Sequence, residues 1–204
     1  MKMRHPSGWR GELERHRLSR MGIRTTQRPM ITYGAKPKVI VVDIDGTIMN
    51  VSKRWNMAKQ VAKPPSRKFW DVFMNPNLLK YDEPIAKTAD ALQTIKKMGF
   101  DIVYLSGRRS TLREQTEKQL KQHGFPRGTI ILRKKGKATE PFKIGVITRL
   151  KQTNNVGVYI GDEADDVYVG KEAKVHTVRV KQNQPWDVIA RKQINKRLKK
   201  AANI

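Results

Sequence analysis

Short apolar runs alternate with amphipathic stretches along most of this chain of 204 residues. Residues 39–42, 101–105 and 156–160 are apolar runs rich in Val, Ile, Leu and Tyr, as expected of strands that are buried on both faces. Residues 84–98 and 110–123 instead repeat apolar positions at helical spacing, and a glycine follows each of them. Strands that alternate with helices predict an α/β fold, here a doubly wound, Rossmann-like parallel sheet.

The same pattern divides the chain into three parts. We predict a basic N-terminal extension over 1–37, an α/β domain over 38–183 and a basic C-terminal helix over 184–204. Within the domain, 50–81 forms a small basic insertion that is too short for a large lid, so the site can admit the end of a polymer. The other predicted elements are helices over 9–21, 142–150 and 186–202, the last with an apolar stripe of Val188, Ile189, Ile194 and Leu198, and strands over 129–132 and 176–180.

The strand at 39–42 ends in Asp43-Ile44-Asp45-Gly46-Thr47. Two carboxylates at the end of a parallel strand can share one divalent cation, and the glycine turn lets backbone N–H groups approach a phosphate. The segment therefore indicates phosphoryl transfer through an aspartate. Its alternative explanation is a solvated strand end or a helix cap.

Three further polar segments follow in chain order. Ser106-Gly107-Arg108 comes after the second strand and is expected to present a hydroxyl and a guanidinium on a flexible turn. Lys143 is expected near the start of its helix, and residues 162–166 form an acidic cluster after the third strand. Each segment alone has an ordinary explanation, as a loop, a solvated lysine or an acidic helix N-terminus. Because the carboxyl ends of parallel strands meet in one crevice, we expect all of them around one metal and one phosphate.

These motifs resemble those of the haloacid dehalogenase (HAD) superfamily of aspartyl-phosphate phosphatases, over about residues 38–180. The sequence is more similar still to the phosphatase domain of bacteriophage-type polynucleotide kinase/phosphatase. It departs from that family at Thr139, four residues before Lys143, where the family usually carries an acid. The closer likeness is carried by Asp43-Ile44-Asp45-Gly46-Thr47 with Arg54, Phe69-Trp70-Asp71-Val72-Phe73, Asp82-Glu83-Pro84-Ile85, and Ser106-Gly107-Arg108-Arg109 followed by Arg113 and Thr116.

The resemblance implies a role for each matched residue and Mg²⁺ as the cofactor. Asp43 would attack phosphorus, while Asp45 would protonate the leaving oxygen and later activate water. The implied catalytic residues are Asp43, Asp45 and Lys143; the implied substrate-binding residues are Thr47, Arg54, Ser106, Gly107 and Arg108; the implied metal ligands are Asp43, Asp45 through its main-chain carbonyl, Asp162 and Asp166.

The net charge of the chain bears on the expected substrate. The chain has 43 Lys plus Arg against 18 Asp plus Glu, a net charge of +25. Residues 1–38 carry ten basic and two acidic side chains, and residues 181–204 carry seven and one. This excess favours a nucleic acid partner, with RNA ahead of DNA, although a solvated basic surface is the alternative. Trp55, Phe69 and Trp70 in the insertion could stack on bases or pack on the core.

Two functions therefore remain open. The first is a magnesium-dependent phosphatase that removes a terminal, 3′, phosphate from nucleic acid during end repair. The second is a basic RNA-binding component of a ribonucleoprotein, for example the ribosome, built on the same fold. The sequence contains no G-x-x-x-x-G-K-[ST] motif, so a kinase or ligase partner would be a separate chain.

The chain has no cysteine, which excludes a disulfide framework and thiolate chemistry. No apolar run approaches the roughly 18 residues of a membrane span, and no signal-peptide core precedes residue 39. We therefore expect a cytoplasmic protein without a membrane span.

Overall fold

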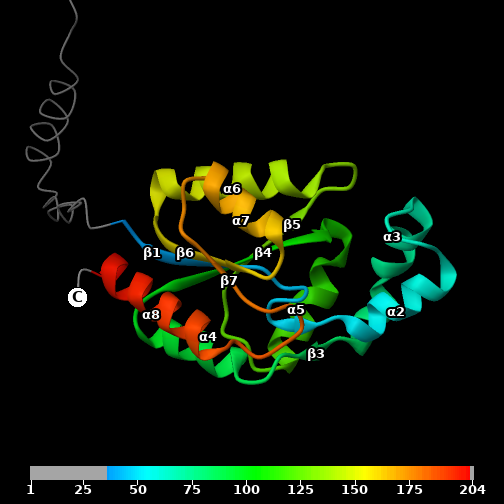
Figure 1. Ribbon diagram of the computed structural model, residues 1–204, viewed down its shortest axis with the longest axis horizontal. Coiled ribbons are helices and arrows are strands. Elements are labelled where there is room, and N and C mark those ends of the chain that lie inside the picture. The colour runs from blue at the N-terminus through cyan, green and yellow to red at the C-terminus, as the bar shows by residue number, and fades with distance from the viewer. Residues whose placement is uncertain (1–35, 203–204) are drawn as a thin grey trace, which may run out of the picture. The chain divides into compact units, whose positions relative to one another are not determined.

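The computed structural model describes residues 36–202, so the predicted helix over 9–21 lies outside the described part (Figure 1). Five parallel strands form one sheet in the order β5-β4-β1-β6-β7, which confirms the predicted α/β fold. The central strand is β1, and the chain order reverses beside it, as in doubly wound sheets. The strands are β1 (Lys38–Val42), β4 (Asp101–Arg109), β5 (Thr129–Arg133), β6 (Asn155–Gly161) and β7 (Thr177–Arg179).

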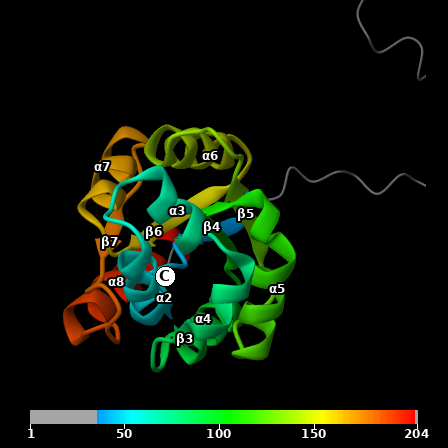
Figure 2. The ribbon, with the colours of Figure 1, turned by 90° about the vertical axis from the view of Figure 1, so that its right-hand side faces the viewer.

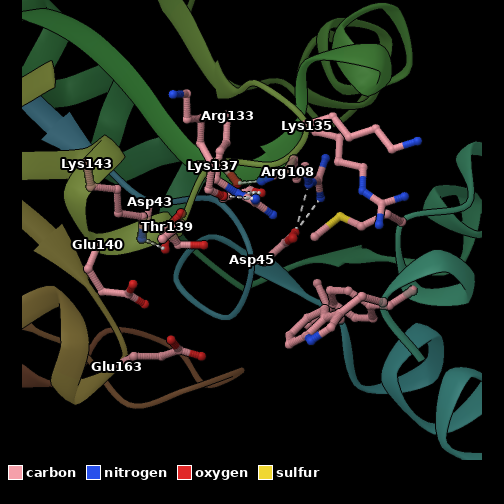
Figure 3. A pocket seen from close by; sticks show the side chains of 18 of the residues that line it. Asp43, Asp45, Arg108, Arg133, Lys135, Lys137, Thr139, Glu140, Lys143 and Glu163 are labelled. Atoms are coloured by element: carbon pink, nitrogen blue, oxygen red, sulfur yellow. Dashed lines mark hydrogen bonds and ion pairs between the residues drawn. The ribbon is translucent and has the colours of Figure 1, made fainter. Parts of the chain in front are cut away.

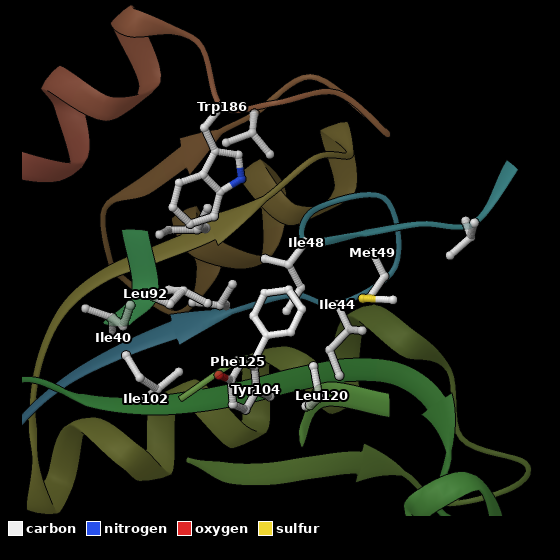
Figure 4. Packing of buried hydrophobic residues seen from close by; sticks show 14 of the residues in the cluster. Ile40, Ile44, Ile48, Met49, Leu92, Ile102, Tyr104, Leu120, Phe125 and Trp186 are labelled. Carbon is white, nitrogen blue, oxygen red and sulfur yellow. The ribbon is translucent and has the colours of Figure 1, made fainter. Parts of the chain in front are cut away.

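Helices cover both faces of the sheet, as Figures 1 and 2 show. Successive side chains of β1 point to opposite faces, so Val39 and Val41 belong to one core cluster and Ile40 and Val42 to the other. The second cluster is seen in Figure 4, where Trp186 also packs. The face with Val39 and Val41 is covered by α6 (Thr139–Thr153) and α7 (Ala164–Glu172). The face with Ile40 and Val42 is covered by α4 (Thr88–Lys97), α5 (Arg113–Gln122) and α8 (Val188–Ala202).

The insertion between β1 and α4 is small and has an aromatic centre. Trp55 packs edge-on against Phe69, with ring centroids 4.7 Å apart, and Phe69 and Phe73 are buried. These rings continue the hydrophobic core of the sheet, which fixes the insertion in place. Its elements are β2 (Met49–Asn50), α2 (Ser52–Val61), α3 (Arg67–Phe73), the 3₁₀-helix η1 (Pro76–Tyr81) and β3 (Glu83–Pro84), which pairs antiparallel with β2.

Two elements near the site differ from the prediction. Ser106, Gly107 and Arg108, predicted on a flexible turn, belong to β4, which pairs with β5 through an irregularity between Ser106 and Arg109. The short helix η2 (Ser110–Leu112) then leads into α5. The helix predicted from residue 84 begins only at Thr88, because residues 83–84 pair with β2 in a strand. A strand therefore presents these site residues on a rigid backbone.

The C-terminal helix α8 buries two of the four residues of its predicted apolar stripe, Ile194 and Leu198. Val188 and Ile189 are 55% and 67% exposed, whereas Ala190, Ile194 and Leu198 are buried in the core of the sheet. Residues four apart share one face of a helix, so Ala190, Ile194 and Leu198 face the sheet together, while Val188 and Ile189 at the start of the helix lie outside that face. The helix is therefore part of the folded core.

Candidate active site

A cavity of about 590 Å³ opens at the carboxyl ends of β1 and β4 and beside α6 (Figure 3). Six of the ten predicted site residues line this cavity, and four do not. Thr47, Arg54, Asp162 and Asp166 are buried, each within contact distance of another site residue. Of the predicted site residues, those that line the cavity are Asp43, Asp45, Ser106, Gly107, Arg108 and Lys143.

Three buried carboxylates meet around Lys143. Side-chain oxygens of Asp43, Asp162 and Asp166 lie within 4.8 Å of one another. Lys143 Nζ donates to Asp43 Oδ2 at 2.7 Å and to Asp166 Oδ1 at 2.7 Å. Tyr159 also donates its hydroxyl proton to Asp166 Oδ1. These groups come from β1, α6, β6 and α7, so the folded sheet is what brings them together.

The lysine is oriented without an acid at position 139. Thr139 instead packs beside Gly107, where an added Cβ would lie 3.1 Å from Thr139 Cγ2. Burial lowers the pKa of Lys143, but Asp43 and the other anionic partners outweigh burial and hold that pKa well above its usual value. Asp43 and Asp166 therefore supply the orientation for which the related family uses an acid.

The acidic cluster fits a divalent cation. Burial raises the pKa of Asp43 to about 8; Lys143 opposes that rise, and Asp166 and Asp162 add to it. Three carboxylates beside one ammonium leave excess negative charge, which a cation would offset. Among the described residues, Asp162 Oδ2 is buried and has no hydrogen-bond partner, while Asp162 Oδ1 accepts from Thr47 Oγ1 at 2.6 Å. The free oxygen of Asp162 is thus available to a metal ion.

Asp45 is held apart from this cluster by two arginines. Its Oδ1 accepts from Arg54 Nη2 at 2.8 Å and from Arg108 Nη2 at 2.6 Å. Burial raises the pKa of Asp45, but Arg108 and Arg54 outweigh burial and lower it to about 2. Asp45 Oδ1 is thus committed to the two arginines.

The two arginines have buried partners that the sequence did not assign to the site. Asp82 accepts from Arg54 Nε at 2.8 Å and from Arg108 Nη2 at 3.0 Å. Gln119 Oε1 accepts from Arg108 Nη1 at 2.8 Å. Asp82 belongs to one of the stretches of family resemblance, which was the available signal; Gln119 carried none. Neither Arg54 nor Arg108 is exposed at all, so this network holds both in fixed positions.

Gly46 permits the close approach of the two acidic loops. Its φ is +79°, and an added Cβ would overlap Asp162 Oδ2. We expect Gly46→Ala to destabilise the protein by about 1 kcal/mol or more, because it combines backbone strain with this overlap. Gly124→Ala is the matched control, since Gly124 has a φ of +73° and nothing within 4 Å of an added Cβ. Urea unfolding of both variants measures the difference, and equal losses would contradict the overlap.

This combination of fold and site defines a class of protein. Aspartates follow the central strand of a doubly wound sheet, a serine lies near the end of the neighbouring strand, and a lysine and an acidic cluster complete the site. That is the arrangement of HAD-like hydrolases. The chain belongs to the HAD superfamily, subfamily IIIB (acid phosphatase), whose family model matches residues 18–198. That family is one of phosphatases.

Solved structures with the same fold include an acid phosphatase and a chain of an RNA repair complex. The class C acid phosphatase from Bacillus anthracis is 26% identical, with a TM-score of 0.50, over 76% of this chain and 59% of that one. A chain of the Pnkp1/Rnl/Hen1 RNA repair complex is 18% identical, with a TM-score of 0.59, over 89% of this chain and 57% of that one. This chain therefore spans less than two thirds of either neighbour.

A shorter neighbour matches along most of its length. The haloacid dehalogenase-like family hydrolase SP0104 from Streptococcus pneumoniae is 14% identical, with a TM-score of 0.55, over 78% of this chain and 90% of that one. At this identity the match shows a shared fold. A search of curated protein sequences found no significant match. Within residues 36–202, no helix is both long and apolar enough to cross a bilayer.

Proposed function

We propose that this chain is a magnesium-dependent phosphomonoesterase that removes a terminal 3′-phosphate from nucleic acid through an aspartyl-phosphate intermediate. The observation that carries the proposal is the position of Asp43, which lies in the cavity wall, accepts a hydrogen bond from Lys143 and clusters with Asp162 and Asp166. A carboxylate there can reach a phosphate, and its charge is balanced by an ammonium and by a cation-binding cluster.

In the first step, a carboxylate oxygen of Asp43 forms a bond to phosphorus and the bond from phosphorus to the leaving oxygen breaks. Asp45 supplies the proton that the leaving oxygen takes up. In the second step, water gives a proton to Asp45 and attacks phosphorus, which frees Asp43 and releases inorganic phosphate. Ser106, Arg108 and Lys143 would hold the other phosphate oxygens during both steps.

Mg²⁺ would be held by Asp43, Asp162 and Asp166 together with the main-chain carbonyl of Asp45. When bound, it would supply positive charge that stabilises the transferring phosphoryl group. Thr47 has a supporting role in this account, because its hydroxyl fixes one oxygen of Asp162 and leaves the other for the ion.

The two arginines would couple substrate binding to the proton chemistry. In the free protein Arg54 and Arg108 keep Asp45 ionised. A substrate phosphate competes for Arg108, which lines the cavity, and draws its positive charge away from Asp45. Asp45 can then take up the proton that the leaving oxygen needs.

A nucleic acid substrate is supported by charge and by the size of the insertion. The net charge of +25 favours a polyanion, and the insertion, with two short α-helices and one 3₁₀-helix, is too small to form a large lid over the cavity. Exposed Arg67, Lys135 and Lys137 line the mouth of the cavity. For such end processing, a separate kinase or ligase chain is the expected partner.

The test is phosphate release from a 3′-phosphorylated RNA oligonucleotide in magnesium. The matched substrate is the same oligonucleotide phosphorylated at its 5′ end instead. We expect release from the 3′ end, much weaker release from the 5′ end, and loss of activity in excess EDTA. Equal release from both ends would contradict the 3′ preference. Tight RNA binding without release from any phosphate ester would instead support the ribonucleoprotein role.

A further inference from the structure

Beyond the groups that surround the reacting phosphate, the cavity has two walls of contrasting chemistry. One is aromatic and consists of Trp55, Trp70 and Phe73 from α2 and α3. The other is cationic and consists of Arg133, Lys135 and Lys137, which lie at the end of β5 and in the segment before α6. Figure 3 shows Arg133, Lys135 and Lys137 in the upper part of the view, near Arg108.

Hydrogen bonds within the turn and to β4 hold the cationic wall in place. Lys137 N–H donates to Lys134 O at 3.3 Å, and Gly136 within this turn has a φ of +82°, a conformation that favours glycine. Arg133 Nε donates to Gly107 O at 3.1 Å, and Arg133 Nη1 donates to Lys137 O. These bonds tie the turn to β4, so its positive charges are carried on a fixed frame beside the site.

Within the described part of the chain, the cationic wall has no acidic partner of its own. Across residues 36–202, no ion pair involves Arg133, Lys135 or Lys137. Burial and the nearby charge of Arg109 lower the pKa of Arg133, while Glu140 opposes them. Cations gathered in this way in a cavity wall are suited to a bound anion.

The aromatic wall is equally fixed. Trp55 and Phe73 have ring centroids 5.6 Å apart, and Trp70 and Phe73 have centroids 5.7 Å apart, both in edge-on geometry. Trp55 and Trp70 are half-buried, so each packs on the core and still lines the cavity. A flat apolar surface held in this way suits a planar base.

We infer that the cavity binds a nucleoside 3′,5′-bisphosphate unit, with its base on Trp55 and Trp70 and its 5′-phosphate on Arg133, Lys135 and Lys137. This inference rests on the proposed function, because it takes the 3′-phosphate to be the group at Asp43. The proposed function assigns Ser106, Arg108 and Lys143 to that phosphate, which leaves the cationic wall and the aromatic wall for the rest of a nucleotide. The same unit occurs as a free nucleotide and as the 3′ end of a strand.

The test compares cytidine 3′-monophosphate with cytidine 3′,5′-bisphosphate, which differ only by the 5′-phosphate. We expect the KM for the bisphosphate to be roughly tenfold lower or more, since the charge-assisted bonds to the extra phosphate form before the reaction. Lys135→Ala combined with Lys137→Ala should remove most of this ratio. Lys118→Ala combined with Lys121→Ala, on the exposed face of α5, removes the same charge elsewhere and should preserve it.

A binding measurement separates failure of this inference from failure of the proposed function. In Asp43→Asn protein, the bisphosphate should quench tryptophan fluorescence, and Trp70→Phe should reduce the quenching. Turnover without a bisphosphate preference and without quenching would overturn the subsite and keep the phosphatase. Quenching without turnover in wild type would overturn the phosphatase and keep the subsite. A 3′-phosphorylated trinucleotide with a KM below that of the bisphosphate would identify the strand end as the source of the unit.

Discussion

Asp43→Asn should reduce the rate of phosphate release by at least about a thousandfold, because an amide cannot act as the attacking nucleophile. The substitution keeps the shape of the side chain. The amide retains one oxygen, which can still accept the hydrogen bond that Asp43 Oδ1 accepts from Ile44 N at 2.7 Å. Lys143 loses its bond to Asp43 Oδ2 but keeps its bond to Asp166. The loss should therefore appear in kcat, with substrate binding retained.

Glu140→Gln provides the matched control for Asp43→Asn. Glu140 also lines the cavity, on the first turn of α6, but its side chain contacts none of the three clustered carboxylates within hydrogen-bond distance. Removing its charge should leave kcat within a few-fold of wild type. Comparable losses in the two variants, measured by phosphate release at saturating substrate, would show that the charge of the cavity matters and that Asp43 is not the nucleophile.

The parts of the site that could be predicted are those in which a functional residue directly follows an apolar run in the sequence. Asp43 and Asp45 follow an apolar run, and Asp162 follows another, so a strand and its chemical group can be read together. The rules for parallel sheets then place the carboxyl ends of these strands in one crevice. The sequence therefore identifies the aspartates and Lys143 as candidate site residues.

The buried polar network could not be predicted in the same way. Asp82 and Arg54 are 28 residues apart, and Gln119 and Arg108 are 11 apart on different elements. Polar residues in a turn or on a charged helix are ordinary in sequence, and only the fold shows that these two are buried. The turn predicted at Ser106-Gly107-Arg108 was wrong for a related reason. Local propensity favours a turn there, but Ser106 pairs with Leu132 of β5, and this pairing continues the strand.

Asp82→Ala should destabilise the protein by about 3–5 kcal/mol, the cost of leaving buried charge without its partner. Asp82 is 3% exposed and receives hydrogen bonds from both Arg54 and Arg108, whose side chains are fully buried. Without Asp82, two guanidiniums share the single carboxylate of Asp45. Urea unfolding should show the loss as a lower midpoint with an unchanged slope.

Asp71, which contacts a different arginine, provides the control for Asp82→Ala. Asp71 accepts from Arg109 Nη2 at 2.7 Å, but Asp71 is half exposed and solvent screens the pair. Asp71→Ala should therefore change stability by only a small fraction of the Asp82→Ala effect, although both remove an aspartate that contacts an arginine. Asp82→Ala should also lower kcat, because Arg54 and Arg108 lose the partner that positions them beside Asp45. Equal stability losses would show that burial of the network does not govern its strength.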